Sequence, residues 1–263
     1  MLERFLNKIV HGDCLEVMSE IPNTSIDMIL CDLPYGTTSC HWDVIIPFEP
    51  LWAHYERIIK NNGAIVLTAS QPFTSMLVMS SLKMFKYCWV WKKERPSNFF
   101  AAKFQPLNDT EDIIVFGKGG CNNGAKIPLR YYPQTTETIN RVARNINTGG
   151  KIGIEHGTAL NRNPFYHQTT TGYPHKIIVF GNDKEKTLHP TQKPVSLFEY
   201  LIKTYTREGD LVLDNCIGSG TTAIACMNTG RNFIGIEKEE KYVEIARNRI
   251  ARNMTLPLQT LPT

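Results

Sequence analysis

The fold expected for this chain follows from one stretch, Leu211-Val212-Leu213-Asp214-Asn215-Cys216-Ile217-Gly218-Ser219-Gly220-Thr221-Thr222. It predicts a buried strand that ends on an acid, a tight glycine turn and the first turn of a helix. Gly218 and Gly220 lack Cβ atoms, so a ligand can approach the backbone at the carboxyl edge of a parallel sheet. The N–H groups at the start of the helix favour an anionic group such as a carboxylate.

A second acid follows at the distance that dinucleotide-binding folds use. Glu237 ends the next apolar run, 23 residues after Asp214, where a carboxylate can meet ribose hydroxyls. Ala223 stands in place of the third glycine of that fingerprint, and glycines also serve turn geometry alone. With both acids included, the pattern favours an adenosine-type cofactor with a compact charged tail.

Outward from this stretch, short apolar runs alternate with helix-compatible segments, a rhythm typical of right-handed crossovers and a parallel sheet. The residues Asn61-Asn62-Gly63 are expected to end a helix. Strands are expected at residues 7–11, 26–31, 64–68, 86–91, 112–116, 211–214 and 232–237, and helices at 13–19, 50–60, 195–205, 221–229 and 239–252.

The α/β rhythm stops between about residues 117 and 186, where only 176–180 is typical of a strand. A structureless segment of this length inside a compact domain indicates a functional insertion. From Gly117 to Leu188 ten Lys and Arg stand against four Asp and Glu, a net charge of +6, whereas the whole chain carries +4. The insertion therefore has the charge of a polyanion-binding surface, although a solvated loop region would also fit.

A second turn follows the strand at 26–31. In Asp32-Leu33-Pro34-Tyr35 the Asp32 carboxylate and a backbone carbonyl near Leu33 can accept both hydrogens of an aryl amine, whose lone pair is otherwise conjugated with its ring. Pro34 stiffens the turn, and the Tyr35 ring offers a face for stacking. Positioning and electrostatics would supply the rate, with no metal and no covalent nucleophile.

Composition narrows the class of protein further. No stretch approaches the ~20 apolar residues that span a bilayer, and residues 1–8 lack the apolar run of a signal peptide. The seven cysteines show no CxxC spacing, which argues against zinc and against a disulfide framework. Thiols of this kind suit a reducing cytosol, so a cytoplasmic protein without a metal is expected.

Together these motifs resemble the circularly permuted β group of DNA amino-methyltransferases, in which the catalytic motif precedes the recognition region and the glycine motif comes last. The resemblance implies an α/β fold with a Rossmann-like seven-stranded, mostly parallel sheet of the class I S-adenosylmethionine-dependent methyltransferases. It further implies a catalytic half at 1–119, a target recognition region at 120–186 and a cofactor-binding half at 187–263. Two departures are Leu33, in place of a proline, and Cys216, in place of an aromatic residue.

The same resemblance assigns site residues. Asp32, Leu33, Pro34 and Tyr35 are the catalytic turn. The expected contacts with S-adenosylmethionine are Asp13, Cys14, Asp32, His189, Thr191, Lys193, Asp214, Gly218, Gly220, Thr221, Thr222 and Glu237.

The expected partner is double-stranded DNA, from which the target base is flipped before transfer. Basic residues of the insertion would contact phosphates or base edges. Trp42-Asp43 shape the catalytic loop or pack in the core, and Asn98-Phe99-Phe100 with Phe104 flank the base pocket or pack in the core. The candidate DNA contacts are Arg130, Arg141, Arg144 and Arg162.

Three hypotheses for function follow. The first is methylation of adenine N6 in DNA, because Asp at the head of the motif is typical of adenine enzymes and Ser of cytosine enzymes. The second keeps the fold and the cofactor but changes the acceptor to cytosine N4, an RNA base or a protein glutamine. The third is a nucleic-acid binding protein without catalysis, which the intact Asp32 and Gly218 argue against. The sequence leaves open a homodimer and a cognate restriction endonuclease.

Overall fold

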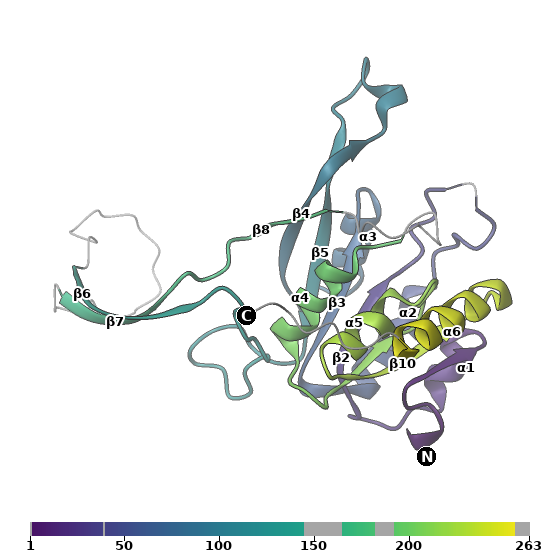
Figure 1. Cartoon of the computed structure of the whole chain (residues 1–263), viewed down its shortest axis with the longest axis horizontal. Coiled ribbons are helices and arrows are strands. Elements are labelled where there is room, and N and C mark those ends of the chain that lie inside the picture. The colour runs from purple at the N-terminus through teal and green to yellow at the C-terminus, as the bar shows by residue number, and fades with distance from the viewer. Residues whose placement is uncertain (1, 39, 145–164, 182–191, 256–263) are drawn as a thin grey trace. The chain divides into compact units, whose positions relative to one another are not determined.

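The computed structural model describes residues 2–38, 40–144, 165–181 and 192–255. The chain divides into two compact units, Met1–Tyr132 with Lys176–Thr263, and Pro133–His175. The larger unit contains the sheet and the helices (Figure 1). The first and last thirds of the sequence thus build one α/β unit, and the smaller unit is inserted between them.

One sheet organises the larger unit, and its strand order is β1-β10-β9-β2-β3-β5-β4-β8. The pairs are parallel except that β5 runs antiparallel to β3 and to β4. Two strands from the end of the sequence, β9 and β10, lie between β1 and β2, as a permuted order requires. The strands are β1 (Lys8–His11), β2 (Ile26–Asp32), β3 (Ile59–Ala69), β4 (Phe85–Ser97), β5 (Asn108–Gly117), β8 (Ile177–Phe180), β9 (Leu211–Asp214) and β10 (Asn232–Glu237).

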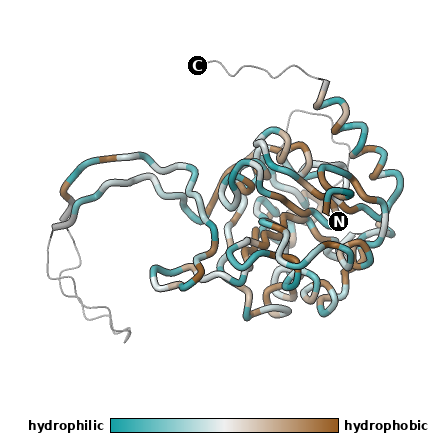
Figure 2. Tube along the Cα trace, turned by 90° about the horizontal axis from the view of Figure 1, so that it is seen from below, coloured by the Kyte–Doolittle hydropathy of each residue, from teal (hydrophilic) through white to brown (hydrophobic). Residues whose placement is uncertain are grey.

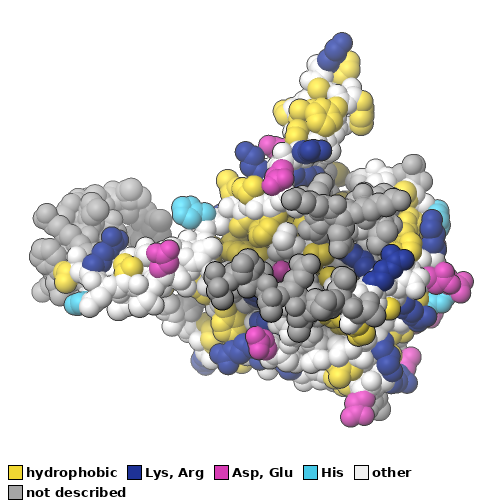
Figure 3. Space-filling view, in the orientation of Figure 1, with side chains coloured by type: hydrophobic (Ala, Val, Ile, Leu, Met, Phe, Trp, Pro, Cys, Tyr) yellow, Lys and Arg dark blue, Asp and Glu magenta, His cyan; other side chains and the backbone are white. Residues whose placement is uncertain are grey.

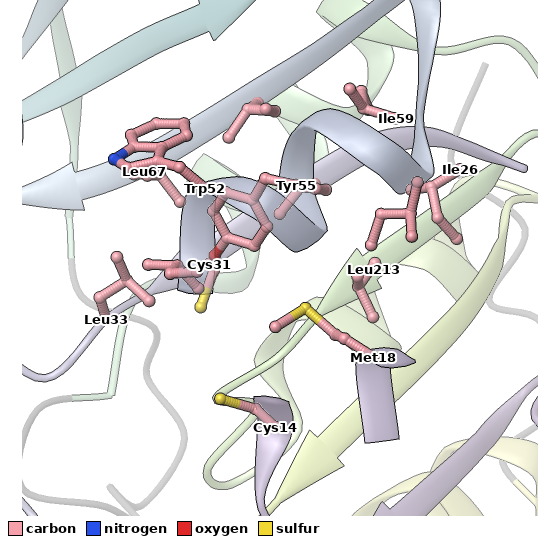
Figure 4. Close-up of a cluster of buried hydrophobic side chains, with 14 of the residues drawn as sticks. Cys14, Met18, Ile26, Cys31, Leu33, Trp52, Tyr55, Ile59, Leu67 and Leu213 are labelled. Carbon is pink, nitrogen blue, oxygen red and sulfur yellow. The ribbon is translucent and has the colours of Figure 1, made fainter. Parts of the chain in front are cut away.

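Both faces of the sheet are covered by helices, because alternate residues of the buried strands point to opposite sides. Ile29 and Cys31 of β2 join the core beneath α1 (Cys14–Ser19), α2 (Phe48–Ile58) and α3 (Phe73–Ser80). Figure 4 shows part of this core, with Trp52 and Tyr55 close to the β2 residue Cys31. Met28 and Leu30 join the opposite core with α4 (Val195–Tyr205), α5 (Thr221–Asn228) and α6 (Glu240–Thr255). Apolar residues accordingly concentrate in the elements of this unit (Figure 2).

The structure confirms an α/β fold with a mostly parallel sheet, and it adds detail that the sequence patterns lacked. The sheet has eight strands rather than seven, since β8, the strand expected within the insertion, pairs with β4. Asn61-Asn62-Gly63 does not end a helix: α2 stops at Ile58 and these residues belong to β3. A Cβ atom on Gly63 would lie 2.7 Å from the Asp27 carbonyl oxygen, so this glycine serves the close pairing of β2 with β3. Helix α3 was not predicted.

The smaller unit is an antiparallel pair, β6 (Glu137–Arg144) and β7 (Phe165–Thr171). Its side chains are mainly hydrophilic (Figure 2). It is shorter than the recognition region expected at 120–186, because residues 120–132 and 176–181 pack with the larger unit. Among the described residues, no helix is both long enough and apolar enough to cross a bilayer.

Candidate active site

A cavity of about 840 Å³ opens at the carboxyl ends of the parallel strands. The loops that follow β1, β2, β9 and β10 line it, and β4 and β5 contribute side chains from the other side. The connections change direction between the neighbouring strands β2 and β9: from β2 the chain continues to β3 on one side, and from β9 it continues to β10 on the other. Ligands of open α/β sheets bind at such a switch point. The structure thus brings the Asp32 turn and the Gly218 turn to one cavity.

The Asp32 carboxylate lines the cavity and accepts three hydrogen bonds. Its Oδ1 atom accepts hydrogen bonds from the hydroxyl groups of Tyr35, at 2.8 Å, and Thr68. Its Oδ2 atom accepts one from the Lys193 ammonium, at 2.7 Å. Since an ionised carboxylate oxygen can accept about two hydrogen bonds, Oδ2 keeps room for one more donor. The geometry thus marks Oδ2 as the atom that can accept an amino hydrogen of a substrate.

Tyr35 is held as a hydrogen-bond donor. Burial, followed by the Asp32 charge, raises the pKa of Tyr35 well above its usual value, so the phenol stays protonated. Its ring stacks on Phe73 with centroids 5.0 Å apart, and the Lys193 Nζ atom lies over the ring, 5.7 Å from its centroid. The Leu33 side chain is buried in the core, and Pro34 lines the cavity.

The resemblance placed Lys193 among the contacts with S-adenosylmethionine, whereas in the structure its ammonium donates a hydrogen bond to the Asp32 carboxylate. The Lys193 side chain is only 7% exposed and also lies 3.4 Å from the Glu111 Oε2 atom. Burial lowers the pKa of Lys193, but the two carboxylates outweigh it and raise that pKa, so the ammonium stays charged. Lys93 pairs with Glu111 Oε1 at 2.7 Å, which makes the group of four side chains electrically neutral.

Glu111, Thr68 and Lys93 were missed by sequence reasoning. Thr68 ends an apolar run that indicates only a core strand, whereas Lys93 and Glu111 lie just outside the apolar runs 86–91 and 112–116. Nothing local marks any of the three as a neighbour of Asp32. Glu111 is an acid directly before the apolar run of β5, but an acid in that position is only a weak indication of a functional residue.

Asp43 shapes the loop after the catalytic turn, as one of the two sequence interpretations suggested. Its carboxylate accepts hydrogen bonds from the backbone N–H groups of Gly36, Thr37 and Thr38, at 2.9, 2.9 and 2.7 Å. Burial raises the pKa of Asp43, but the hydrogen bonds from Thr38 and the backbone outweigh it and lower that pKa. Neighbouring Trp42 lines the cavity beside Tyr242, with ring centroids 6.3 Å apart.

Replacing Asp43 with alanine should reduce kcat for methyl transfer by about tenfold, because the loop beside Tyr35 loses its three hydrogen bonds to the Asp43 carboxylate.

The lowered pKa of Asp43 also predicts how stability depends on pH. The Asp43 carboxylate stabilises the fold above its unfolded pKa near 3.8 and loses this effect as the pH falls. The difference in free energy of unfolding between wild type and Asp43→Asn should therefore be constant from about pH 5 to 8 and shrink below about pH 4. Urea titrations measure it, with the exposed Glu49→Gln as control. A difference that grows on acidification would contradict this role.

The acids expected at the cofactor lie together at the ends of β1 and β10. Asp13 caps α1, accepting from the Leu15 N–H group at 3.0 Å, and Lys238 lies 3.2 Å away. The two oxygens of Glu237 accept the N–H groups of Gly218, at 2.9 Å, and Glu239, at 2.8 Å. The backbone N–H group of Lys238 also hydrogen-bonds to this carboxylate, so about one of its four acceptor positions is left for a ribose hydroxyl. Cys14, the first residue of α1, is buried and lines the same cavity.

Asp214 is buried behind the glycine turn. It accepts hydrogen bonds from the Thr222 hydroxyl and from the Cys216 N–H group at 3.0 Å. Burial raises its pKa to about 7. Thr221 is equally buried and receives a hydrogen bond from Arg249 at 3.2 Å. Both threonines line the cavity and hold the turn in shape.

The raised pKa of Asp214 predicts how stability depends on pH. A carboxyl group whose folded pKa exceeds its unfolded value of 3.8 stabilises the fold below that value, and the effect is lost as the pH rises through about 7. The free energy of unfolding of wild type, relative to Asp214→Asn, should therefore fall by at most about 4 kcal/mol between pH 4 and 8. Urea titrations at several pH values provide the test, and a difference independent of pH would contradict it.

Two predicted residues have structural roles instead. Gly220 does not line the cavity: its φ is +87°, and a Cβ atom there would lie 3.2 Å from Ala246 of α6, so helix packing requires the glycine. The Arg130 guanidinium lies 2.7 Å from Asp27 and 2.8 Å from Asp210, at the amino ends of β2 and β9. It pairs with the buried Asp27 at the edge opposite the cavity, which gives it a role in the sheet, and its contact with DNA stays a prediction.

The remaining predicted residues are only partly placed. Arg141 lies in β6, where its Nε atom donates to Gln168 of β7 at 2.8 Å, and Arg144 is the last residue of β6. His189, Thr191 and Arg162 lie outside the described residues.

The cavity fits an adenosine cofactor by the chemistry of its walls. Glu237 and Asp13 offer acceptors to hydroxyl and amino groups, the Gly218 turn allows close approach, and Trp42 with Tyr242 offers aromatic surface. Asp32 stands in the same cavity with a free acceptor position. A doubly covered sheet with this strand order and this cavity defines a Rossmann-like protein with a nucleotide-binding site.

The particular family follows from comparison with known proteins. A family model described as DNA methylase, which covers N6 and N4 methyltransferases, matches residues 26–248. The chain belongs to this family and is an S-adenosylmethionine-dependent DNA methyltransferase, which confirms the family inferred from the motifs.

Two curated relatives are type II methyltransferases. M.HinfI of Haemophilus influenzae is 27% identical over 275 residues, covering 94% of this chain and 68% of the relative. M2.DpnII of Streptococcus pneumoniae is 28% identical over 283 residues, covering 97% of this chain and 95% of the relative.

Solved structures share the fold. The M1.HpyAVI complex with SAM has a TM-score of 0.59 at 24% identity, covering 92% of this chain and 98% of that one. The cytosine-N4-specific PvuII DNA methyltransferase has a TM-score of 0.64 at 14% identity, covering 96% and 87%.

Proposed function

We propose that this enzyme methylates N6 of a flipped adenine in double-stranded DNA at a specific sequence. The observation that carries the proposal is the Asp32 carboxylate, which faces the cofactor cavity with one acceptor position free on Oδ2. An aspartate at the head of the catalytic turn favours adenine over cytosine by the family resemblance. The type II relatives support an association with restriction and modification in the cytoplasm, and a homodimer and a cognate endonuclease stay predictions.

The residues of the site perform positioning and charge control. Asp32 Oδ2 accepts one amino hydrogen of the base, which directs the nitrogen lone pair out of the ring plane. Tyr35 and Thr68 fix the orientation of the carboxylate through Oδ1, and the Lys193 ammonium donates a hydrogen bond to Oδ2. S-adenosylmethionine, when bound, supplies the electrophilic methyl group. Asp32 also stabilises the positive charge that develops on the attacking nitrogen.

The test is incubation with methyl-labelled S-adenosylmethionine and unmethylated bacterial DNA, followed by mass spectrometry of the nucleosides. Labelled N6-methyladenine is the expected product, and sequencing of the product then maps the target. Labelled N4-methylcytosine would keep the fold and mechanism but overturn the base. No label in any DNA nucleoside would overturn the proposal and point to another acceptor or to a protein that only binds nucleic acid.

A further inference from the structure

The strands β4 and β5 continue beyond the sheet as a hairpin, residues 92–110, here called the aromatic arm. Its strands pair as far as Ser97 and Asn108, and a short helix, Phe99–Ala101, forms its tip. Figure 1 shows the arm extending past the end of the sheet. Arg95, Pro96 and Ser97 line the cavity that contains Asp32, so the arm rises from the wall of the active site.

The tip of the arm is apolar and faces solvent. Phe99, Phe100 and Phe104 are 65%, 91% and 89% exposed. The sequence allowed core packing for these rings, but the structure places them outside the core. Figure 3 shows hydrophobic side chains gathered along the arm. Three exposed phenylalanines within six residues indicate an interaction surface, because soluble proteins seldom leave such clusters uncovered.

The charged side chains beside these rings indicate the class of partner. The arm contains four Lys and Arg against two acids, Glu94 and Asp109. Lys92, Arg95 and Lys103 are exposed, so cations flank the rings. A surface of aromatic rings between cations matches nucleic acid, in which phosphates surround flat bases. The enzyme's own DNA substrate is the polyanion that must reach this cavity.

We propose that the tip of the aromatic arm enters the DNA duplex beside the target base and occupies the stack that this base leaves. The inference rests on the proposed function, since it requires duplex DNA as substrate. Apolar wedges of this type separate base steps in other DNA-binding proteins. Phe100 and Phe104 are the wedge residues because they are the most exposed rings. The arm thereby promotes extrusion of the base toward Asp32.

The experiment compares wild type with the double variant Phe100→Ala/Phe104→Ala on two duplexes that carry the mapped target sequence. In one the target base is paired, and in the other it faces a mismatch and is already destabilised. On the paired duplex we expect kcat/KM of the variant to fall about 10- to 100-fold. On the mismatched duplex, which needs less help to extrude the base, most of the loss should be recovered.

Met254→Ala is the control. Met254 is 67% exposed, but α6 packs against β1 at the other edge of the sheet from β4. This variant should match wild type on both duplexes. Because the phenylalanines are exposed, the double variant should also bind S-adenosylmethionine with wild-type affinity.

Three results would overturn the wedge. The first is a kcat/KM of the double variant equal to that of wild type on the paired duplex, and the second is an equal loss on both duplexes. The third is a double variant that sediments as a monomer where wild type sediments as a dimer, which would make the tip an interface with a second copy. Failure of the proposed function is distinguishable, because then wild type itself labels no adenine in DNA.

Discussion

Replacing Asp32 with alanine is expected to abolish methyl transfer while DNA and S-adenosylmethionine still bind. The variant loses the acceptor on Oδ2 and the negative charge beside the reacting nitrogen, which together should lower kcat by about 10³-fold. Binding should persist, because the acids at the cofactor, Asp13 and Glu237, belong to other loops. Single-turnover transfer of a labelled methyl group measures the rate, and calorimetry measures binding.

A second variant separates charge from shape. Asp32→Asn keeps an oxygen for Tyr35 and Thr68 but removes the charge, and we expect a loss close to that of alanine. Lys193 retains Glu111 as a partner, so the fold should survive. Asp112→Asn is the matched control, since Asp112 accepts from Thr74 at 2.8 Å and does not line the cavity. Turnover of Asp32→Ala at the wild-type rate would contradict the role of Asp32 as acceptor of the amino hydrogen.

Replacing Lys193 with methionine is expected to damage both stability and catalysis. The variant leaves Asp32 and Glu111 as neighbouring carboxylates without their shared buried cation, and breaking such a pair lowers the free energy of unfolding by about 3–5 kcal/mol. Repulsion between the two acids should also displace the Asp32 carboxylate from the orientation that Tyr35 and Thr68 give it. A displaced carboxylate accepts the amino hydrogen poorly, so kcat should fall about 100-fold.

The double variant Lys193→Met/Glu111→Gln tests the cause. Removing the second carboxylate relieves the repulsion, so stability should recover relative to Lys193→Met, and part of the lost kcat should return. Lys93→Met is the matched control, since it removes a cation from Glu111 but leaves the pair between Lys193 and Asp32. Equal stability of the single and double variants would show that Lys193 is not required to balance these carboxylates.

The local sequence was sufficient for the elements that follow from periodicity and turn chemistry. Apolar runs predicted the strands of the sheet, and the residues before Thr221 predicted a strand, a glycine turn and a helix. The two acidic turns, at Asp32 and Asp214, could be assigned to one sheet edge because parallel strands present their carboxyl ends together. The family followed from the order of these motifs.

The partners of each charged residue could not be obtained in this way. The Lys193 ammonium meets Asp32 across 161 positions, and Arg130 meets Asp27 across 103. Exposed and buried arginines look alike in a sequence, so Arg130 was grouped with DNA contacts. Phe99, Phe100 and Phe104 have core composition, yet the hairpin carries them away from the sheet into solvent.

Periodicity, turn residues and motif spacing are local properties, so the sequence alone was sufficient for an α/β fold with a permuted motif order, and the resemblance carried by those motifs implied a methyltransferase with Asp32 as its catalytic aspartate. Long-range contacts alone establish that β8 joins the sheet, that Gly220 packs against α6, that Arg130 pairs with Asp27, and that Lys193 and Glu111 lie beside Asp32. The physical reason is that these contacts depend on strand pairing between distant segments, and the charge and burial of each side chain follow from those pairs.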